Sequence, residues 1–82
     1  MLKTDVLMDF NRRLGNALQD MRREKRISQT KMGESLGLSQ TGISQMESGQ
    51  VSISAYIVHH YLKTCGGNPE ALFNLLEGKK EK

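Results

Sequence analysis

Apolar residues recur at steps of three and four along most of this chain, which is the spacing of one face of a helix. The first series predicts a helix that ends near Lys25, with a face made of Leu7, Phe10, Leu14, Ala17 or Leu18, and Met21. Its start is open, because Thr4 or Asp5 could cap it, or residues 1–10 could form a loose extension. No stretch alternates apolar and polar residues long enough to predict a sheet.

Four more helices are predicted from residues that suit a helix start. A serine or asparagine side chain can accept a hydrogen bond from a free backbone N–H of the first turn, and the candidates are Ser28, Ser39, Ser54 and Asn68, the last followed by Pro69. The predicted ends are Leu36, about Ser48, the glycine pair at 66–67, and Gly78. We therefore predict an all-α, five-helix domain over residues 11–78, with a disordered basic tail at 79–82.

The second and third predicted helices are separated only by Gly37-Leu38-Ser39. Two helices joined by such a short turn containing glycine form a helix-turn-helix. Gly37 can take the left-handed conformation that ends a helix, and Leu38 can plug the angle between the helices. Gly33 and Gly42 lie inside helices, where each costs about 1 kcal/mol relative to alanine, so we expect close helix crossings there. An ordinary helical hairpin in a small bundle would show the same pattern.

Basic residues are concentrated at the two ends of the chain. Eight of the twelve Lys and Arg residues lie between Lys3 and Lys31, three lie at 79–82, and only Lys63 lies elsewhere. The formal net charge of +3 is a mild indication of an acidic partner. A solvated helix face would also account for the early cluster.

Several classes of function lack the residues that they need. No apolar run approaches the roughly 18–20 residues of a membrane span, and no signal peptide is expected. The single cysteine, Cys65, has no companion for a disulfide or a metal, and the adjacent His59 and His60 cannot face one metal ion. No phosphate loop, nucleophile elbow or carboxylate pair occurs. We expect a cytoplasmic protein without catalytic residues, metal or other cofactor.

The run from Leu14 to Gln50 resembles the lambda-repressor-like, Cro/Xre-type helix-turn-helix domains. The register that carries this resemblance consists of Gln29, Gly33, Gly37, Leu38, Ser39, Ile43, Ser44, Glu47 and Gly49. The similarity extends over roughly Asn11 to Leu76. It implies a compact five-helix domain that places the second helix of the motif in the major groove of DNA, in several members as a dimer.

The third predicted helix carries the candidate base-reading side chains. At 100° per residue, positions 40, 41, 44 and 48 project to one side, with Gln45 at the margin, whereas Ile43 and Met46 point the opposite way. Together with the resemblance, this predicts base contacts from Gln40, Thr41, Ser44 and Gln45. Glutamine can pair with adenine through two hydrogen bonds, and threonine or serine can contact either base type or a thymine methyl group. A polar surface on a short helix is the alternative.

The resemblance also implies that Gln29 contacts phosphate and braces Gln40, and that Glu47 forms a structural pair with Arg22. The expected phosphate contacts come from Ser28, Gln29, Lys31, Ser39, Ser48, Gln50, Arg12, Arg13, Lys25 and Arg26. Unlike many relatives, this chain has no Lys or Arg in or just after the third helix. Since phosphate neutralisation supplies much of the affinity for DNA, tight binding would depend more strongly on a dimer.

These features predict a sequence-specific transcriptional regulator, expected to be a repressor, that binds double-stranded DNA as a homodimer on a near-palindromic operator. The expected dimer seam is formed by Leu72, Phe73, Leu75 and Leu76, which could instead close the core. The alternative is a protein-binding module on the same fold, such as an antitoxin or anti-repressor. It would bind a regulatory protein partner through residues 1–10 and the surplus apolar surface of the last two helices.

Overall fold

Five helices make up the part of the chain that the computed structural model describes, residues 3–77. They are α1 (Lys3–Glu24), α2 (Gln29–Leu36), α3 (Gln40–Glu47), α4 (Ala55–Cys65) and α5 (Pro69–Leu76). The prediction of an all-α fold is confirmed, and residues 3–10 form the first turns of α1. The basic tail expected at 79–82 lies outside the described residues. No helix in the described range is both long and apolar enough to cross a membrane.

The predicted caps set the starts of four helices. The hydroxyl oxygens of Ser28, Ser39 and Ser54 each accept a hydrogen bond from the backbone N–H three residues later, at 3.0, 3.0 and 3.3 Å. At α5, Asn68 Oδ1 accepts from the N–H of Glu70 at 2.8 Å, and proline occupies the first turn. These contacts involve only close neighbours in the chain, which is why the sequence located them.

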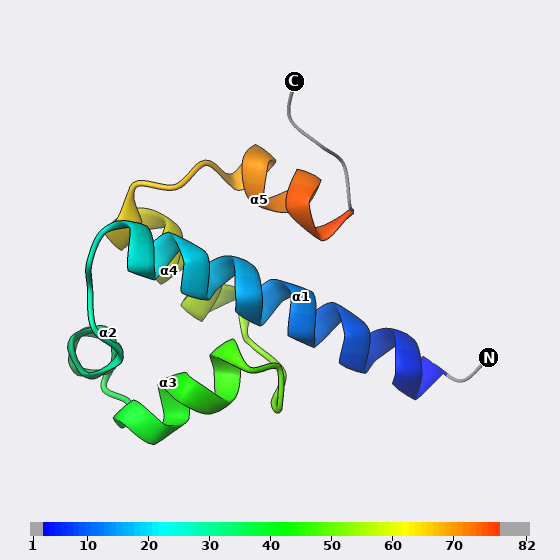
Figure 1. Cartoon of the computed structure of the whole chain (residues 1–82), viewed down its shortest axis with the longest axis horizontal. Helices are drawn as coiled ribbons and strands as arrows, with labels where there is room; N and C mark the ends of the chain where they lie inside the picture. Colours follow the sequence, from blue (N-terminus) through cyan, green and yellow to red (C-terminus); the bar gives the residue numbers. More distant parts are fainter. Residues whose placement is uncertain (1–2, 78–82) are drawn as a thin grey trace.

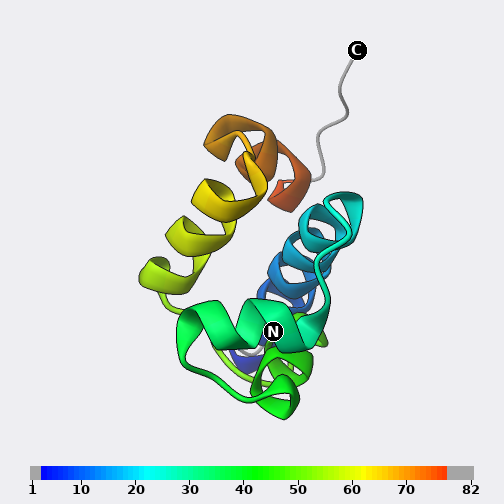
Figure 2. The same cartoon turned by 90° about the vertical axis from the view of Figure 1, so that its left-hand side faces the viewer.

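α1 is the central element, and the other helices are grouped around it. In Figure 1, α3 lies below α1 and α5 above it. Figure 2, seen from the side, shows α4 opposite α1, with α5 closing one end and the α2–α3 pair the other. The buried apolar core draws on all five helices and consists of Leu14, Ala17, Leu18, Met32, Ile43, Met46, Tyr61, Cys65, Leu72 and Leu76.

Close backbone approaches occur at two helical glycines. A Cβ atom on Gly33 would lie 2.5 Å from the carbonyl oxygen of Leu38, whereas one on Gly42 would meet nothing closer than the Ser39 hydroxyl at 3.5 Å. The expectation of a close crossing is therefore confirmed for Gly33 and wrong for Gly42. The second close approach is at Gly15, which the sequence did not single out. A Cβ atom there would lie 2.4 Å from the carbonyl oxygen of Met46, where α1 crosses α3.

The turn between α2 and α3 is closed by backbone hydrogen bonds. Gly37 has φ 74° and ψ 28°, the left-handed conformation that glycine adopts without Cβ strain. The N–H of Leu38 then donates to the carbonyl oxygen of Gly33 at 2.8 Å. The Leu38 side chain remains 38% exposed, so it does not plug the junction as expected. The buried apolar residues of the two helices are instead Met32, Ile43 and Met46.

Alanine substitutions at Gly33 and Gly42 should change stability in opposite directions. In Gly33→Ala the new methyl group would overlap the carbonyl oxygen of Leu38 in the turn, and we expect a loss of about 1–3 kcal/mol. In Gly42→Ala the space is open, and better helix propensity should add up to about 1 kcal/mol. Urea unfolding of both variants measures the difference. Equal stability of the two variants would contradict the close approach at Gly33.

Candidate nucleic-acid interface

Four helices meet at one carboxylate, that of Glu47 on α3, which is 1% exposed. Arg22 on α1 donates from Nε and Nη2 to the two carboxylate oxygens at 2.8 and 2.9 Å. The hydroxyl of Tyr61 on α4 donates to Oε2 at 2.7 Å, and Nε2 of Gln29 on α2 donates to Oε1 at 3.2 Å. The side chains thus surround a single negative charge with hydrogen-bond donors from three other helices.

This network supplies the partners that buried charges require. Arg22 is also buried, and its Nη1 donates to the carbonyl oxygen of Ile27 at 2.6 Å, which ties the loop between α1 and α2 to the same site. Among the described residues, no buried side-chain nitrogen or oxygen lacks a hydrogen-bond partner. A buried ion pair is tolerated when such bonds satisfy both charges, and removal of one partner strands the other.

The protonation states follow from burial and from these hydrogen bonds. Burial alone would raise the pKa of the Glu47 carboxyl. The hydrogen bonds from Arg22, Tyr61 and Gln29 together lower this pKa by more than burial raises it, so it lies below its ordinary value. The hydrogen bond to Glu47 raises the pKa of Arg22. Burial, followed by the hydrogen bond to Glu47, raises the pKa of the Tyr61 phenol. At neutral pH the site therefore holds a carboxylate, a guanidinium and a neutral phenol donor.

Gln29 carries this network to the surface. Because the Glu47 carboxylate only accepts hydrogen bonds, it holds the NH₂ group of Gln29, and the amide oxygen of Gln29 points away from it. That oxygen accepts a hydrogen bond from Nε2 of Gln40, the first residue of α3. The Gln40 amide therefore turns one N–H inward. Its carbonyl oxygen and its second N–H remain for a partner outside the domain.

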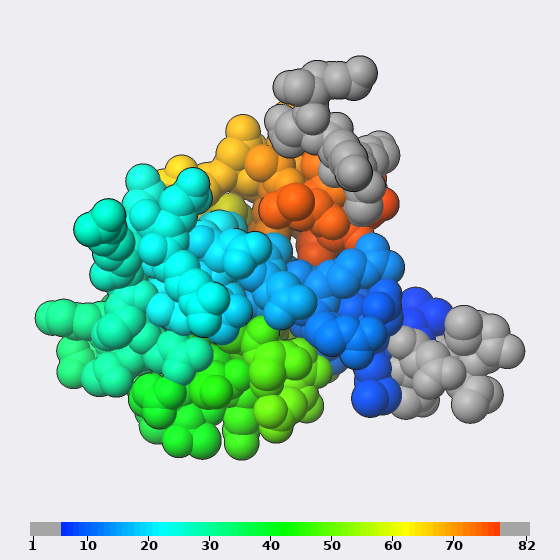
Figure 3. Space-filling model, in the orientation of Figure 1, coloured from blue at the N-terminus to red at the C-terminus, as the bar shows by residue number. Residues whose placement is uncertain are grey.

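The other polar residues of α3 lie on the same outward side. Gln40, Thr41 and Gln45 are exposed and Ser44 is half-buried, whereas Ile43, Met46 and Glu47 are buried. In Figure 3, the residues of α3 form the lower edge of the molecule, clear of α5. The four predicted base-reading residues thus form one accessible surface, which we call the reading face.

Several of the predicted phosphate-contact residues lie in the loop before α2, on α2, or next to α3. Lys25 and Arg26 lie in the loop before α2, and exposed Lys31 lies on α2 itself. Ser28 and Ser39 use their hydroxyl oxygens as helix caps, which leaves the hydroxyl hydrogens to donate. After α3, Gln50 Nε2 donates to the Ser48 hydroxyl at 2.8 Å. Their contact with phosphate stays a prediction.

A family model described as "Helix-turn-helix domain" matches residues 13–76 of this chain. The chain belongs to this family of DNA-binding transcription regulators. The family binds DNA and is not enzymatic, and the predicted resemblance is confirmed. The chain is also similar to the "ImmF control region 10 kDa protein" of Bacillus phage phi105, with 41% identity over 39 residues. That match covers 48% of this chain and 43% of the phage protein, less than half of either.

The two adjacent arginines of α1 have different positions in this helix-turn-helix domain. Gly49, in the turn after α3, approaches Arg12 so closely that a Cβ atom would lie 2.5 Å from the Arg12 Cα. Arg13 instead donates to the carbonyl oxygen of Leu76 at the end of α5, on the opposite side of α1 from α3 (Figure 1). The expectation that Arg13 contacts phosphate is therefore corrected: its guanidinium holds α5. Both arginines also pair with Asp9, at 3.0 and 2.7 Å.

The four apolar residues of α5 divide into two pairs. Leu72 and Leu76 are 2% and 7% exposed and belong to the core of the same chain, so they offer little surface of their own to the expected dimer seam. Phe73 and Leu75 are 57% and 55% exposed. The alternative that these residues close the core therefore applies to the first pair only.

Tyr61 is the residue of this site that the sequence did not reveal. It is fully buried, and its hydroxyl is bonded to Glu47. Its spacing of three from Val58 and four from Cys65 was the available signal.

Loss of Arg22 should destabilise the domain far more than loss of its neighbour Arg23. Arg22→Ala strands the buried Glu47 carboxylate, and we expect a cost of about 3–5 kcal/mol. Arg23→Ala removes an exposed charge on the same helix turn and should cost less than about 1 kcal/mol. Thermal and urea unfolding of the two variants measure the difference. Superimposable unfolding curves would refute the role assigned to the Glu47 network.

Proposed function

We propose that this helix-turn-helix domain is a sequence-specific repressor that binds a near-palindromic operator in the cytoplasm as a homodimer without a cofactor. The observation that carries the proposal is the ordered chain of hydrogen bonds from Glu47 through Gln29 to Gln40. It orients an exposed amide at the start of α3, where a base edge could reach it. A polar helix face without a binding role would need no such bracing.

The orientation of Gln40 favours adenine as its target. Adenine presents N6–H as a donor and N7 as an acceptor in the major groove, and a glutamine amide can pair with both. The free carbonyl oxygen and N–H of Gln40 match this pattern. Thr41 and Gln45, on the same reading face, would contact neighbouring base pairs.

The loop before α2 supports a phosphate-binding role. Arg26 has φ 60°, a left-handed conformation that costs roughly 1–2 kcal/mol for residues other than glycine. Arginine at this position places a positive charge two residues before the cap Ser28, where the N–H groups that begin α2 favour an anion. Lys25 and Lys31 would add charge on either side of this contact.

Two copies on one operator follow from the small size of the reading face. Four short polar side chains can touch only a few base pairs, too few to select one site among genomic competitors. α3 also carries no basic residue that would add non-specific affinity. The repressor role is supported by the similarity to a phage control-region protein, since a domain that occupies DNA can block transcription by occupancy alone.

Gln40→Ala and Gln29→Ala should weaken discrimination at the same base pair of each half-site. The first removes the base contact and the second removes its bracing, and a good bidentate pair discriminates by about 1–3 kcal/mol. In vitro selection of binding sites, followed by titration of single-base variants, measures this. Lys31→Ala is the matched control, because loss of a phosphate contact should weaken all sequences alike and flatten the salt dependence. Unchanged base preference in both glutamine variants would overturn the proposal that the reading face contacts bases.

The homodimer can be tested through the spacing of half-sites. Two recognition helices about 34 Å apart match half-sites roughly 10 base pairs apart, centre to centre. An insertion of five base pairs puts the half-sites on opposite faces of the duplex, and cooperative binding should disappear in a mobility-shift titration. Undiminished affinity for the spaced operator would rule out a rigid dimer while leaving base recognition by one copy intact.

A further inference from the structure

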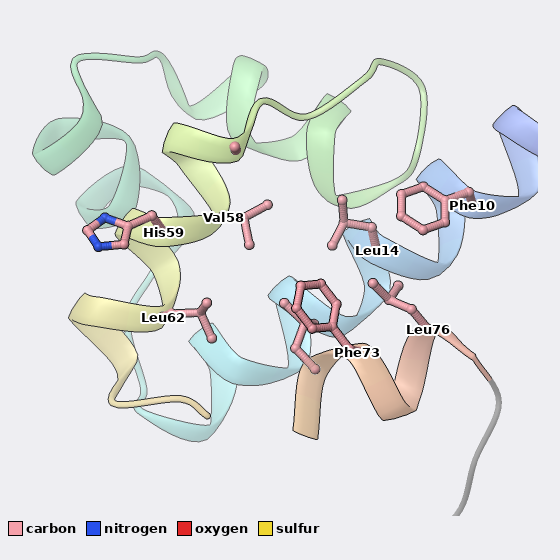
Figure 4. A pocket seen from close by; sticks show the side chains of 9 residues that line it. Phe10, Leu14, Val58, His59, Leu62, Phe73 and Leu76 are labelled. Atoms are coloured by element: carbon pink, nitrogen blue, oxygen red, sulfur yellow. The ribbon is translucent and has the colours of Figure 1, made fainter. Parts of the chain in front are cut away.

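An apolar groove of about 330 Å³ lies between α1, α4 and α5. Its walls include Phe10 and Leu14 from α1, Val58 and Leu62 from α4, and Phe73 and Leu76 from α5. Figure 4 shows Phe10, Phe73 and Leu76 gathered where α1 and α5 face each other, with Val58 and Leu62 opposite them. The ring of His59 lies on the outer side of α4, away from these side chains. The groove can therefore accept apolar side chains.

The core-facing stripe of α1 continues beyond the body of the domain. Leu14, Phe10 and Leu7 follow each other at helical spacing on one face, and their exposed fractions rise from 5% through 44% to 52%. On either side of Leu7, Val6 and Met8 are both 56% exposed. Figure 1 shows the first turns of α1 extending past the ends of α3 and α5. This stripe is thus apolar, helical and uncovered.

The uncovered surface is large enough to matter for assembly. Aromatic side chains bury roughly 150–250 Å² each, so the half-exposed Phe10 and Phe73 leave on the order of 100 Å² each in water. With Val6, Leu7 and Met8, the apolar area reaches several hundred Å². A standard interface takes roughly 800 Å² per partner, and such a patch suits its apolar centre.

We propose that the first turns of α1 from one copy lie in the groove of a second copy, and that the second copy does the same in return. This inference rests on the proposed homodimer and specifies its seam. Groove and stripe occur on the same chain and meet at Phe10, which belongs to both. A two-fold axis covers both features in both copies with one contact used twice, whereas a foreign helix in the groove would leave the stripe exposed.

The proposed seam is compatible with binding to DNA. The stripe extends past α3 at the end where Gly49 approaches Arg12. A partner held there lies beyond the C-terminal end of α3 and leaves Gln40, at the N-terminal end, accessible. Of the exposed residues that the sequence analysis expected at the dimer seam, the proposed seam includes Phe73. It excludes Leu75, which lies 200° from Phe73 around α5 and does not line the groove.

The first test is self-association of the full chain without DNA, measured by sedimentation equilibrium. We expect the wild-type protein to dimerise, and Leu7→Glu and Phe73→Glu each to weaken dimerisation at least tenfold. Leu75→Glu is the matched control, with the same substitution at an equally exposed leucine outside the groove, and it should dimerise like wild type. Circular dichroism checks that all variants fold. Equal dimerisation of the Leu7→Glu and Leu75→Glu proteins would overturn the seam.

The second test asks which residues of two copies meet. A Leu7→Cys chain is mixed with a Phe73→Cys chain and treated with a short bismaleimide, while the native Cys65 is buried and should stay unreacted. We expect the mixed cross-linked dimer, identified by mass, and little of it when Leu75→Cys replaces Phe73→Cys. A wild-type dimer without this cross-link overturns the seam but leaves the homodimer and its DNA-binding role standing. A wild-type monomer that still selects its operator base overturns the seam and the dimer, but not base recognition.

Discussion

The Glu47 carboxylate is the point on which the arrangement of the first four helices depends. It accepts hydrogen bonds from Arg22, Tyr61 and Gln29, each on a different helix. A buried charge is costly unless all its hydrogen-bonding capacity is used. Displacement of any one of these helices would remove a hydrogen bond from the buried carboxylate and so destabilise the fold. This requirement makes the position of α3 relative to α1, α2 and α4 specific, in a way that apolar packing alone would leave looser.

Close backbone contact allows this short-range network to form. α3 lies so near α1 that a Cβ atom on Gly15 would fall within 2.7 Å of the carbonyl oxygens of both Met46 and Glu47. At such a distance the Glu47 side chain meets the Arg22 guanidinium directly. The same network ends at the surface in the Gln40 amide, so the element that fixes the fold also orients the proposed base contact. If Gln40 reads a base as proposed, stability and recognition are coupled through a few hydrogen bonds.

α1 has different roles on its different sides. Toward α3 it supplies Arg22 and the close approach at Gly15, and toward α5 it supplies Arg13, which holds the last turn of that helix. Its first turns extend beyond both neighbours and present the apolar stripe around Leu7. A single long helix thus links the reading face, the core and the proposed seam, and a partner held by the stripe would be held in a fixed relation to α3.

The sequence by itself determined the starts of four helices and the turn at Gly37, because capping and turn formation involve residues within four positions of each other. Its motif also indicated the family. The tertiary structure decided which faces are covered. Adjacent Arg12 and Arg13 lie 100° apart on α1, and only the positions of α3 and α5 place Arg12 beside the turn at Gly49 and Arg13 at the end of α5. The exposure of Phe73, the burial of Leu72 and the contact of Tyr61 with Glu47 likewise depend on how helices cross. Those crossings are set by side chains far apart in the chain, which local periodicity does not encode.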